Sequence, residues 1–114
     1  METKSSSFIV ESATTWENLG NGISRQIMGY DGQIMMVKVK FETGAIGYVH
    51  QHFHSQTTYV ASGEFEVNIN NEKKILSTGD GFYTEPDLAH GVVCLQAGVL
   101  IDVFSPMRLE FLKK

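Results

Sequence analysis

The chain has 114 residues, of which 42% are hydrophobic and 19% charged, a composition typical of one folded globular domain and unlike that of a disordered chain. Its formal net charge of −4 argues against nonspecific nucleic-acid binding, because neutralising phosphates requires a clustered basic surface and the Lys and Arg residues here are scattered. The polar start of the chain leads only into a short apolar group at 8–10, so we predict no signal peptide, no membrane span and a cytoplasmic location.

Short runs of β-forming residues follow one another along the chain, separated by turn-forming Gly, Asn and Asp residues. The predicted strands are Ile23–Met28, Gln33–Phe41, Gly47–His52, Thr57–Ala61, Phe65–Ile69, Lys74–Leu76, Gly81–Thr84, Gly91–Leu95 and Val99–Ser105. Turns are predicted at Ser62-Gly63 and Ala97-Gly98 among others, and short helical turns at Thr14–Leu19 and Met107–Leu112. Many short strands at close spacing predict an all-β sandwich or barrel.

The stretch 35–41 shows how such a strand divides its two faces. Val37, Val39 and Phe41 fall on one face, and the two lysines between them fall on the other. This alternation predicts a strand with one buried face and one solvent-exposed face. The lone Cys94 has no partner for an intrachain disulfide, so we expect it to be a buried small hydrophobe.

Three histidines and a glutamine have the spacing of metal ligands on a β-sheet. His50 and His52 lie two residues apart, so in a strand both imidazoles project from the same face and can bind one ion. Gln56 keeps the same parity and offers an amide oxygen, and the distant His90 supplies a third imidazole if the sheet brings it close. His54 shares the parity too, but a turn before the next strand breaks the alternation, so we place it behind the ligands or at the rim.

An isolated His-x-His pair in a β protein is more often exposed or hydrogen-bonded than bound to metal, but the flanking residues favour a metal site here. The two segments are Gly44-(x)5-His50-x-His52-(x)3-Gln56-(x)6-Gly63 and Gly79-Asp80-(x)4-Glu85-Pro86-Asp87-(x)2-His90. Together they resemble the two signature motifs of the cupin superfamily, G(X)5HXH(X)3,4E(X)6G and G(X)5PXG(X)2H(X)3N. Gln56 replaces the usual glutamate of the first motif. Glu85, Asp87 and Cys94 depart from the second motif, whereas His90 is retained.

The resemblance to cupins implies an all-β fold, a double-stranded β-helix or jelly-roll-like small barrel with minor helical turns. It predicts a single cupin domain over 1–114, with an N-terminal arm at 1–22, the motif region at 33–105 and a C-terminal tail at 106–114. It also implies one divalent transition metal in the barrel mouth, with four ligands: His50, His52, Gln56 and His90. Since these ligands are neutral, the ion should act as a strong Lewis acid, and zinc, nickel, iron and manganese are all open.

A second polar group follows on the stretch 99–108. Asp102 and Phe104 share one strand face. An Asp within an apolar strand needs either an ion-pair or hydrogen-bond partner or a functional role. An ion pair with Arg25 or Arg108 explains Asp102 equally well on sequence alone. The segments 50–56, 90–92 and 102–108 taken together, however, are similar to the pectin-degradation cupins, which linearise unsaturated monouronates.

That narrower resemblance implies catalytic roles for Asp102, Arg108 and Phe104 beside the metal, and no further cofactor. The expected reaction converts a cyclic 4,5-unsaturated monouronate, left by breakdown of pectin- or alginate-type polysaccharides, to a linear keto acid. In this scheme Asp102 moves the proton as general acid/base, Arg108 binds the uronate carboxylate and Phe104 packs on the sugar. The partner is then a small-molecule sugar acid.

Two other functions stay open at this point. One is another cupin activity, a sugar isomerase or epimerase or an iron dioxygenase, although a glutamine ligand departs from the 2-His-1-carboxylate set of oxygen-activating iron. The other is a noncatalytic sugar- or metal-binding module. We also expect a homodimer, in which the apolar segment Phe8–Val10 adds to a neighbour's sheet. Whether Arg25, Tyr59 and Tyr83 contact the substrate is left open.

Overall fold

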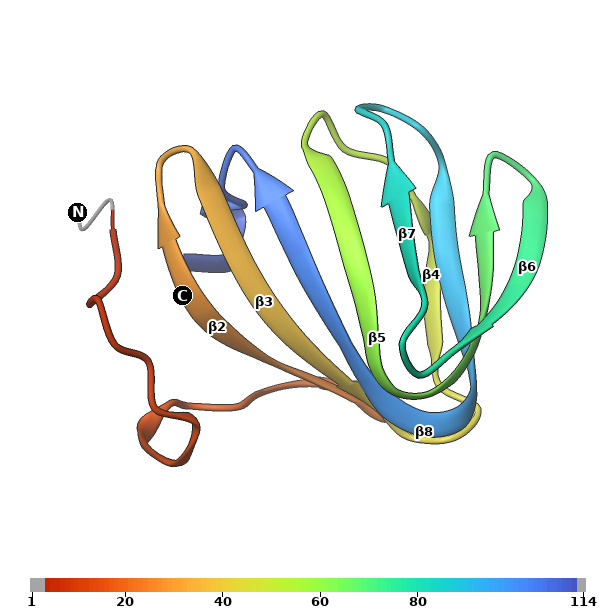
Figure 1. Cartoon of the computed structure of the whole chain (residues 1–114), viewed down its shortest axis with the longest axis horizontal. Coiled ribbons are helices and arrows are strands. Elements are labelled where there is room, and N and C mark those ends of the chain that lie inside the picture. Colours follow the sequence, from red (N-terminus) through yellow and green to blue (C-terminus); the bar gives the residue numbers. More distant parts are fainter. Residues whose placement is uncertain (1–3, 113–114) are drawn as a thin grey trace.

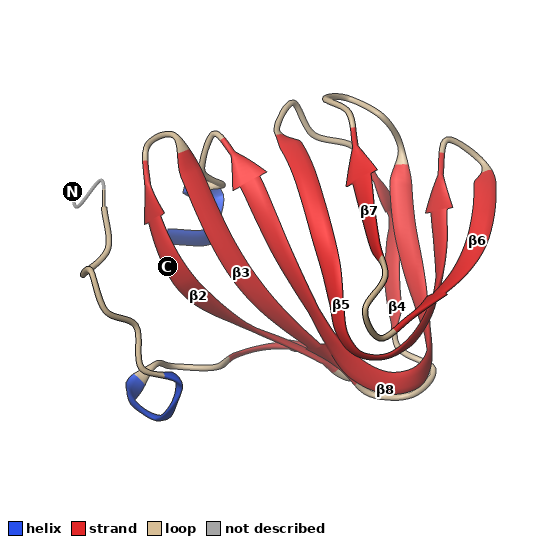
Figure 2. Cartoon of the chain, viewed as in Figure 1, coloured by secondary structure: helices blue, strands red, loops and turns tan. Residues whose placement is uncertain are grey.

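A computed structural model of the chain describes residues 4–112. The elements in chain order are η1 (Glu11–Ala13), β1 (Glu17–Gly20), β2 (Ile23–Asp31), β3 (Ile34–Phe41), β4 (Ile46–His50), β5 (Ser55–Ile69), β6 (Glu72–Ser77), β7 (Gly81–Thr84), β8 (His90–Ser105) and η2 (Leu109–Leu112). Strands dominate the fold, and the helical content of the described residues is limited to two short 3-10 turns (Figure 2). The predicted all-β fold is therefore confirmed. The outermost residues of the predicted arm and tail, 1–3 and 113–114, lie outside the described range.

All strand pairs are antiparallel and follow the order β1-β2-β3-β8-β5-β6, with β4 paired to β8 and β7 paired to β5. Figure 1 shows β5 and β8 bending round the lower end of the molecule, so that each of them belongs to two facing halves of one curved sheet. The loops after β4 and after β7 both lie at the upper end. This curvature creates an interior with a closed lower end and an open upper end.

Two predicted turns lie instead inside long strands. The turn expected at Ser62-Gly63 falls within β5, and the one expected at Ala97-Gly98 falls within β8. Gly63 has φ +90°, and a Cβ atom on Gly98 would lie only 2.0 Å from the carbonyl oxygen of Ser62. The two glycines therefore let both strands bend sharply and shift register while their pairing continues.

The predicted helical turn at Thr14–Leu19 is wrong. The helical turn lies earlier, at η1, because the Val10 carbonyl accepts hydrogen bonds from the Ala13 N–H at 3.0 Å and the Thr14 hydroxyl at 2.7 Å. The residues that follow form β1, which pairs with β2 through a tight turn of positive-φ residues at 20–22. The helical turn predicted near the C-terminal end is confirmed as η2.

Apolar side chains fill the interior in two clusters. The larger one consists of Phe41, Ala45, Val60, Phe65, Val67, Cys94 and Leu100, and the smaller one of Met35, Val37 and Phe104. Phe41 and Phe65 meet edge to face, with ring centroids 5.2 Å apart. The alternation predicted for 35–41 holds at Val37 and Phe41, which are buried, whereas Val39 is half-buried and packs against the core.

Cys94 is buried as expected, and its thiol donates a hydrogen bond to the Gln96 carbonyl at 3.1 Å. Burial raises the pKa of this thiol, so Cys94 is an inert core residue. Across residues 4–112, no helix has the length and apolarity needed to cross a membrane.

Candidate active site

The predicted metal ligands come together at the open upper end of the sheet. His50 is the last residue of β4 and His90 the first of β8, and these two residues are register partners. His52 follows in the loop after β4, and Gln56 is the second residue of β5. Because the loops after β4 and β7 meet at this end (Figure 1), ligands far apart in sequence become neighbours.

The three imidazoles face one point. The candidate ligand atoms of His50, His52 and His90 all lie within 4.8 Å of one another. The side-chain oxygen of Gln56, Oε1, lies 3.1 Å from Nε2 of His52 and 3.1 Å from Nε2 of His90. All four predicted ligands therefore converge, as the spacing in the sequence predicted.

The protonation of the three rings explains what this point can hold. Each ring places Nδ1 against a backbone carbonyl, which can only accept a hydrogen bond, so Nδ1 must carry the proton. The carbonyls belong to Tyr48 for His50 at 3.0 Å, to His54 for His52 at 3.1 Å and to Leu88 for His90 at 2.9 Å. The Nε2 atoms of His52 and His90 then carry bare lone pairs that face the Gln56 oxygen with no proton between them. A cation at this point resolves that repulsion, so the residues fit a metal ion.

The surroundings keep the His52 and His90 rings neutral. Burial, followed by the positive charge of Arg108, lowers the pKa of His52 to about 4. Burial also lowers the pKa of His90, although the hydrogen bond to Leu88 opposes this effect. Neutral imidazole is the form that binds metal, so both rings are ready as ligands at neutral pH.

Hydrogen bonds fix the Gln56 amide and connect it to Asp102. The amide nitrogen of Gln56 donates to the Thr58 hydroxyl at 3.0 Å and to Oδ1 of Asp102 at 3.3 Å. The Thr58 hydroxyl in turn donates to the same carboxylate oxygen at 2.7 Å. These bonds use the nitrogen end of the amide, so its oxygen end must point toward the histidines.

Asp102 has the properties of a proton-transfer group. Burial is the largest influence on its carboxyl group and raises its pKa to about 6, although Thr58 and Arg108 oppose the shift. Within residues 4–112 the salt bridges of the two candidate arginines go elsewhere, Arg25 to Glu17 and Arg108 to Glu110. The alternative of a structural ion pair for Asp102 is therefore not supported, and its partners are Thr58 and Gln56.

A cavity of about 290 Å³ joins the histidines to the second predicted group. Among its lining residues are His50, Gln56, His90, Asp102, Phe104 and Arg108. The guanidinium carbon of Arg108 lies 5.0 Å from the centre of the Phe104 ring, so these two side chains form one wall. The structure thus gathers three of the predicted metal ligands and the predicted substrate residues around one space, with His52 beside it against Gln56.

The residues whose roles were left open differ in whether they line this cavity. Tyr59 and Tyr83 are 52% and 58% exposed, and neither lines this cavity. Arg25 does line it. His54 is buried, stacks on Phe53 with ring centroids 4.0 Å apart, and supports His52 through its backbone carbonyl. It therefore lies behind the ligands, one of the two positions expected for it.

Two lining or supporting residues were not predicted. Thr58 has the same strand parity as Gln56, which is the signal that could have identified it. Phe111 comes from η2 and gives no such signal in the sequence.

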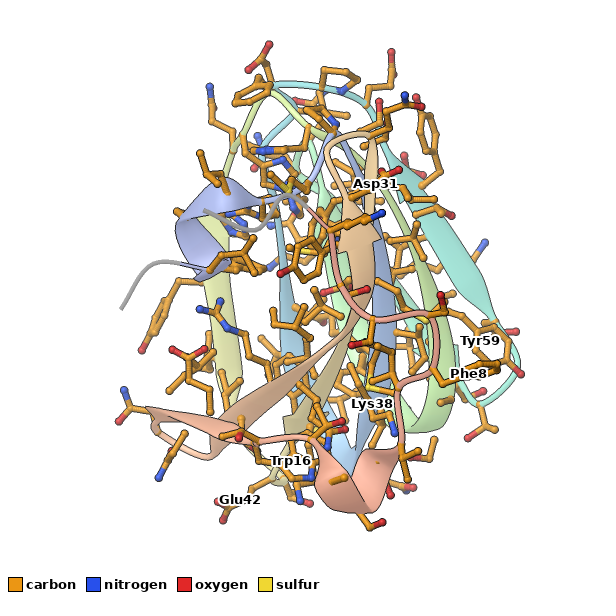
Figure 3. The ribbon with its side chains drawn as sticks, turned by 90° about the vertical axis from the view of Figure 1, so that its left-hand side faces the viewer. Phe8, Trp16, Asp31, Lys38, Glu42 and Tyr59 are labelled. Carbon is orange, nitrogen blue, oxygen red and sulfur yellow. The ribbon has the colours of Figure 1, made fainter. Side chains whose placement is uncertain are left out.

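A larger cavity, of about 570 Å³, lies elsewhere, and Trp16 and Glu42 are among the residues that line it. Figure 3 shows these two residues at the lower end of the molecule, opposite the end that carries Asp31 at the tip of the β2–β3 hairpin. None of the three clustered histidines lines this cavity, so the smaller one is the candidate active site.

Comparisons with known proteins agree with this geometry. The family model described as a cupin domain matches residues 37–104. The chain is 50% identical over 107 residues to the pectin degradation protein KdgF of Dickeya dadantii (strain 3937), covering 92% of this chain and 97% of that protein.

Two solved structures are also similar. A RmlC-like cupin from Shewanella frigidimarina NCIMB 400 is 44% identical with a TM-score of 0.95, covering 96% of this chain and 99% of that one. KdgF from Halomonas sp. is 39% identical with a TM-score of 0.89, covering 94% of this chain and 99% of that one.

Proposed function

The chain belongs to the cupin domain family, and we propose that it is a metal-dependent enzyme of pectin breakdown that converts cyclic 4,5-unsaturated monouronates to linear keto acids. One observation carries this proposal: unprotonated imidazole nitrogens and an amide oxygen converge beside a carboxyl group of raised pKa in a single cavity. The names of two relatives support the substrate class, since both are called KdgF and one is described as a pectin degradation protein.

His50, His52, Gln56 and His90 are the residues that would hold one divalent transition metal. Zinc, nickel, iron and manganese all accept imidazole nitrogen, and the amide oxygen completes the set. When bound, such an ion supplies Lewis acidity toward an oxygen of the substrate. The fixed Nδ1–H bonds of the rings keep the ligand atoms aimed at one point, so binding requires little rearrangement of the protein.

Asp102 is the proposed general acid/base. In the proposed reaction the anomeric hydroxyl loses a proton, the bond between the anomeric carbon and the ring oxygen breaks, and the alkene carbon gains a proton as the enol becomes a ketone. One proton is removed and one is added, so the reaction is an isomerisation with no net water. A carboxyl group whose pKa is about 6 can both accept and return a proton near neutral pH.

Arg108 and Phe104 are the proposed substrate-binding residues. The planar guanidinium group of Arg108 matches the fork of a uronate carboxylate. The Phe104 ring, which is buried beside it, offers an apolar surface to one face of the sugar and excludes water from the reacting atoms.

The experiment is direct. Purified, metal-loaded protein is incubated with unsaturated monouronates generated by a pectin or alginate lyase, and loss of the ring double bond is followed by ultraviolet absorbance and NMR. We expect the alkene signal to disappear and linear keto acid signals to appear, with chelator-treated protein as the control. An unchanged alkene in the presence of metal-loaded protein contradicts the proposal. Oxygen consumption during the assay would support the dioxygenase alternative instead.

The oligomeric state and the location are further proposals. Phe8 is 89% exposed and Val10 is 59% exposed on the arm that precedes β1, which supports a homodimer in which this segment packs on a second copy. A single domain over 1–114 and a cytoplasmic location also remain predictions. Light scattering of the wild type and of Phe8→Ser tests the dimer, and a monomeric wild type would contradict it.

A further inference from the structure

Arg25 lies on β2, far in sequence from the other residues of the candidate site, yet its side chain lines the same cavity as His50, Asp102 and Arg108. The side chain is largely buried, with 15% of its surface exposed. A buried arginine needs partners for its charge, and among residues 4–112 the side-chain partner of Arg25 is Glu17, bound through Nε.

The surroundings of Arg25 and Arg108 are closely alike. The Nε atom of Arg25 donates to Glu17 at 2.9 Å, and that of Arg108 donates to Glu110 at 2.7 Å. In both pairs the glutamate is the more exposed partner. Within the described part of the chain, the side-chain hydrogen bonds of both arginines therefore run through Nε, which leaves the Nη groups of both for a ligand.

Phe111 brings the two guanidinium groups together. The guanidinium carbon, Cζ, lies 3.8 Å from the centre of the Phe111 ring in Arg25 and 4.5 Å in Arg108. The two Cζ atoms therefore lie no more than about 8 Å apart, since both contact one ring, and both arginines line the same cavity. One carboxylate in this cavity, beside the Phe111 ring, is within reach of both arginines.

The charge of the cavity favours an anion at this position. Two buried cations so close together repel each other, and Asp102 is the acidic residue among those that line the cavity. Asp102 is already engaged by Thr58 and Gln56. A ligand carboxylate would satisfy the free Nη groups and offset the repulsion between the arginines.

We propose that Arg25 is a second carboxylate-binding residue, which with Arg108 forms a two-arginine clamp that selects uronates over neutral sugars. The proposal rests on the proposed function for its substrate class. It adds a residue from β2 to a site otherwise described from β4 and the loop after it, β5, β8 and the C-terminal segment. It also gives a role to Phe111, whose ring supports both guanidinium groups.

The test measures binding separately from turnover. Titration calorimetry compares galacturonate, which is saturated and retains the carboxylate, with galactose, which lacks it, on metal-loaded wild type, Arg25→Gln and Arg25→Lys. We expect Arg25→Gln to weaken galacturonate binding by at least about 10-fold and to leave galactose binding unchanged. The affinity of Arg25→Lys for galacturonate should lie between those of wild type and Arg25→Gln, because a lysine keeps the charge and loses the planar fork.

Lys38→Gln is the matched control, since it also removes a cation paired with an exposed glutamate, Glu11, but lies outside the cavity. It should change neither affinity. Metal content and circular dichroism of each variant show whether it folds. If Arg25 had a merely structural role, its substitution would lower the metal content or weaken the binding of both sugars together. Either result overturns the clamp.

The outcomes also separate the clamp from the proposed reaction. Binding of galacturonate that depends on Arg25, without turnover of the unsaturated monouronate, leaves the clamp standing and removes the reaction. Turnover with an unchanged KM in Arg25→Gln supports the reaction and overturns the clamp. A wild type that does not bind galacturonate overturns the clamp as well.

Discussion

The inward-facing residues of β5 and β8 differ sharply between the two ends of the molecule. Toward the open end most of them are polar, namely Gln56, Thr58, His90 and Asp102, with Phe104 beside them. Toward the closed end, along the same strands, they are apolar: Val60, Phe65, Cys94 and Leu100. The change takes place within two residues on each strand, from Thr58 to Val60 and from Asp102 to Leu100. One continuous interior is thus divided into a part that stabilises the fold and a part that can carry chemistry.

The two parts contribute differently to stability. Burying apolar side chains at the closed end favours folding by about 25 cal/mol for each Å² removed from water. At the open end, the amide, hydroxyl and carboxyl groups are hydrogen-bonded to one another, but the lone pairs of His52 and His90 face the Gln56 oxygen without a proton between them. Changes at the open end should therefore affect activity much more than folding, and the following predictions are ordered by their effect on turnover.

The largest effect is expected from His90→Ala. Removing one of three imidazoles should abolish most metal binding and lower turnover by roughly 10³-fold, since a metal supplies several kcal/mol of transition-state stabilisation. The fold should persist. Elemental analysis and the alkene assay measure the two effects, with circular dichroism as the check on folding. Full metal occupancy in the variant would show that His90 is not a ligand.

Asp102→Asn should keep the metal and lose turnover by about 10²-fold or more, which is the usual contribution of a general acid/base. The amide is nearly isosteric and can still accept the hydrogen bond from Thr58. Metal content and kcat are measured on the same preparation. Unchanged turnover would mean that Asp102 has only a structural role.

Phe65→Ala tests the closed end, and it should lower the stability of the fold while leaving turnover nearly unchanged. Phe65 is fully buried against Phe41, and its truncation should lower the free energy of unfolding by about 3–5 kcal/mol. At temperatures where the variant is folded, turnover should stay within a few-fold of wild type. Urea denaturation and kcat at low temperature measure the two quantities. A large loss of kcat in folded protein would show that the two ends are coupled.

The smallest effect concerns the pH dependence of stability in metal-free protein. His52 has a pKa of about 4 when folded against 6.5 ordinarily, so the unfolded state binds its proton more readily and stability should fall as pH drops from about 6.5 toward about 4. Asp102 acts in the opposite direction. Its raised folded pKa of about 6 means that its contribution is greatest at low pH and is lost as pH rises through about 6.

Asp102→Asn should therefore make the metal-free protein lose more stability than wild type between pH 7 and pH 5. Urea denaturation at the two pH values measures this difference. An identical loss in both proteins would indicate that Asp102 is not buried enough to shift its pKa.

Much of the open end was predictable because strand parity is a local property. The two-residue spacing of His50 and His52, continued at Gln56, requires only that these residues lie near strand ends on one face. The same rule placed Asp102 beside Phe104. Applied one step further, it would have identified Thr58 as an inward-facing polar residue beside Gln56.

The missed features depend on contacts between distant segments. Nothing near Arg25 in the sequence indicates that Phe111 packs against it, because that contact depends on how η2 returns across the sheet. The turns predicted at Gly63 and Gly98 were wrong for a related reason. A glycine after a strand is usually a turn signal, and only the pairing of β5 with β8 shows that both strands continue through a bend.

Those two glycines have a practical consequence for mutational scanning. A Cβ atom on Gly63 would lie 2.6 Å from the Gln96 carbonyl oxygen, and one on Gly98 would lie 2.0 Å from that of Ser62, so no larger residue fits at either position. Neither glycine lines the cavity, yet β8 reaches from His90 to Asp102 through this bend. A scan that selects only for activity would rank these glycines with the ligands. Pairing it with a selection for protein abundance would tell residues that shape the scaffold from residues that meet the substrate.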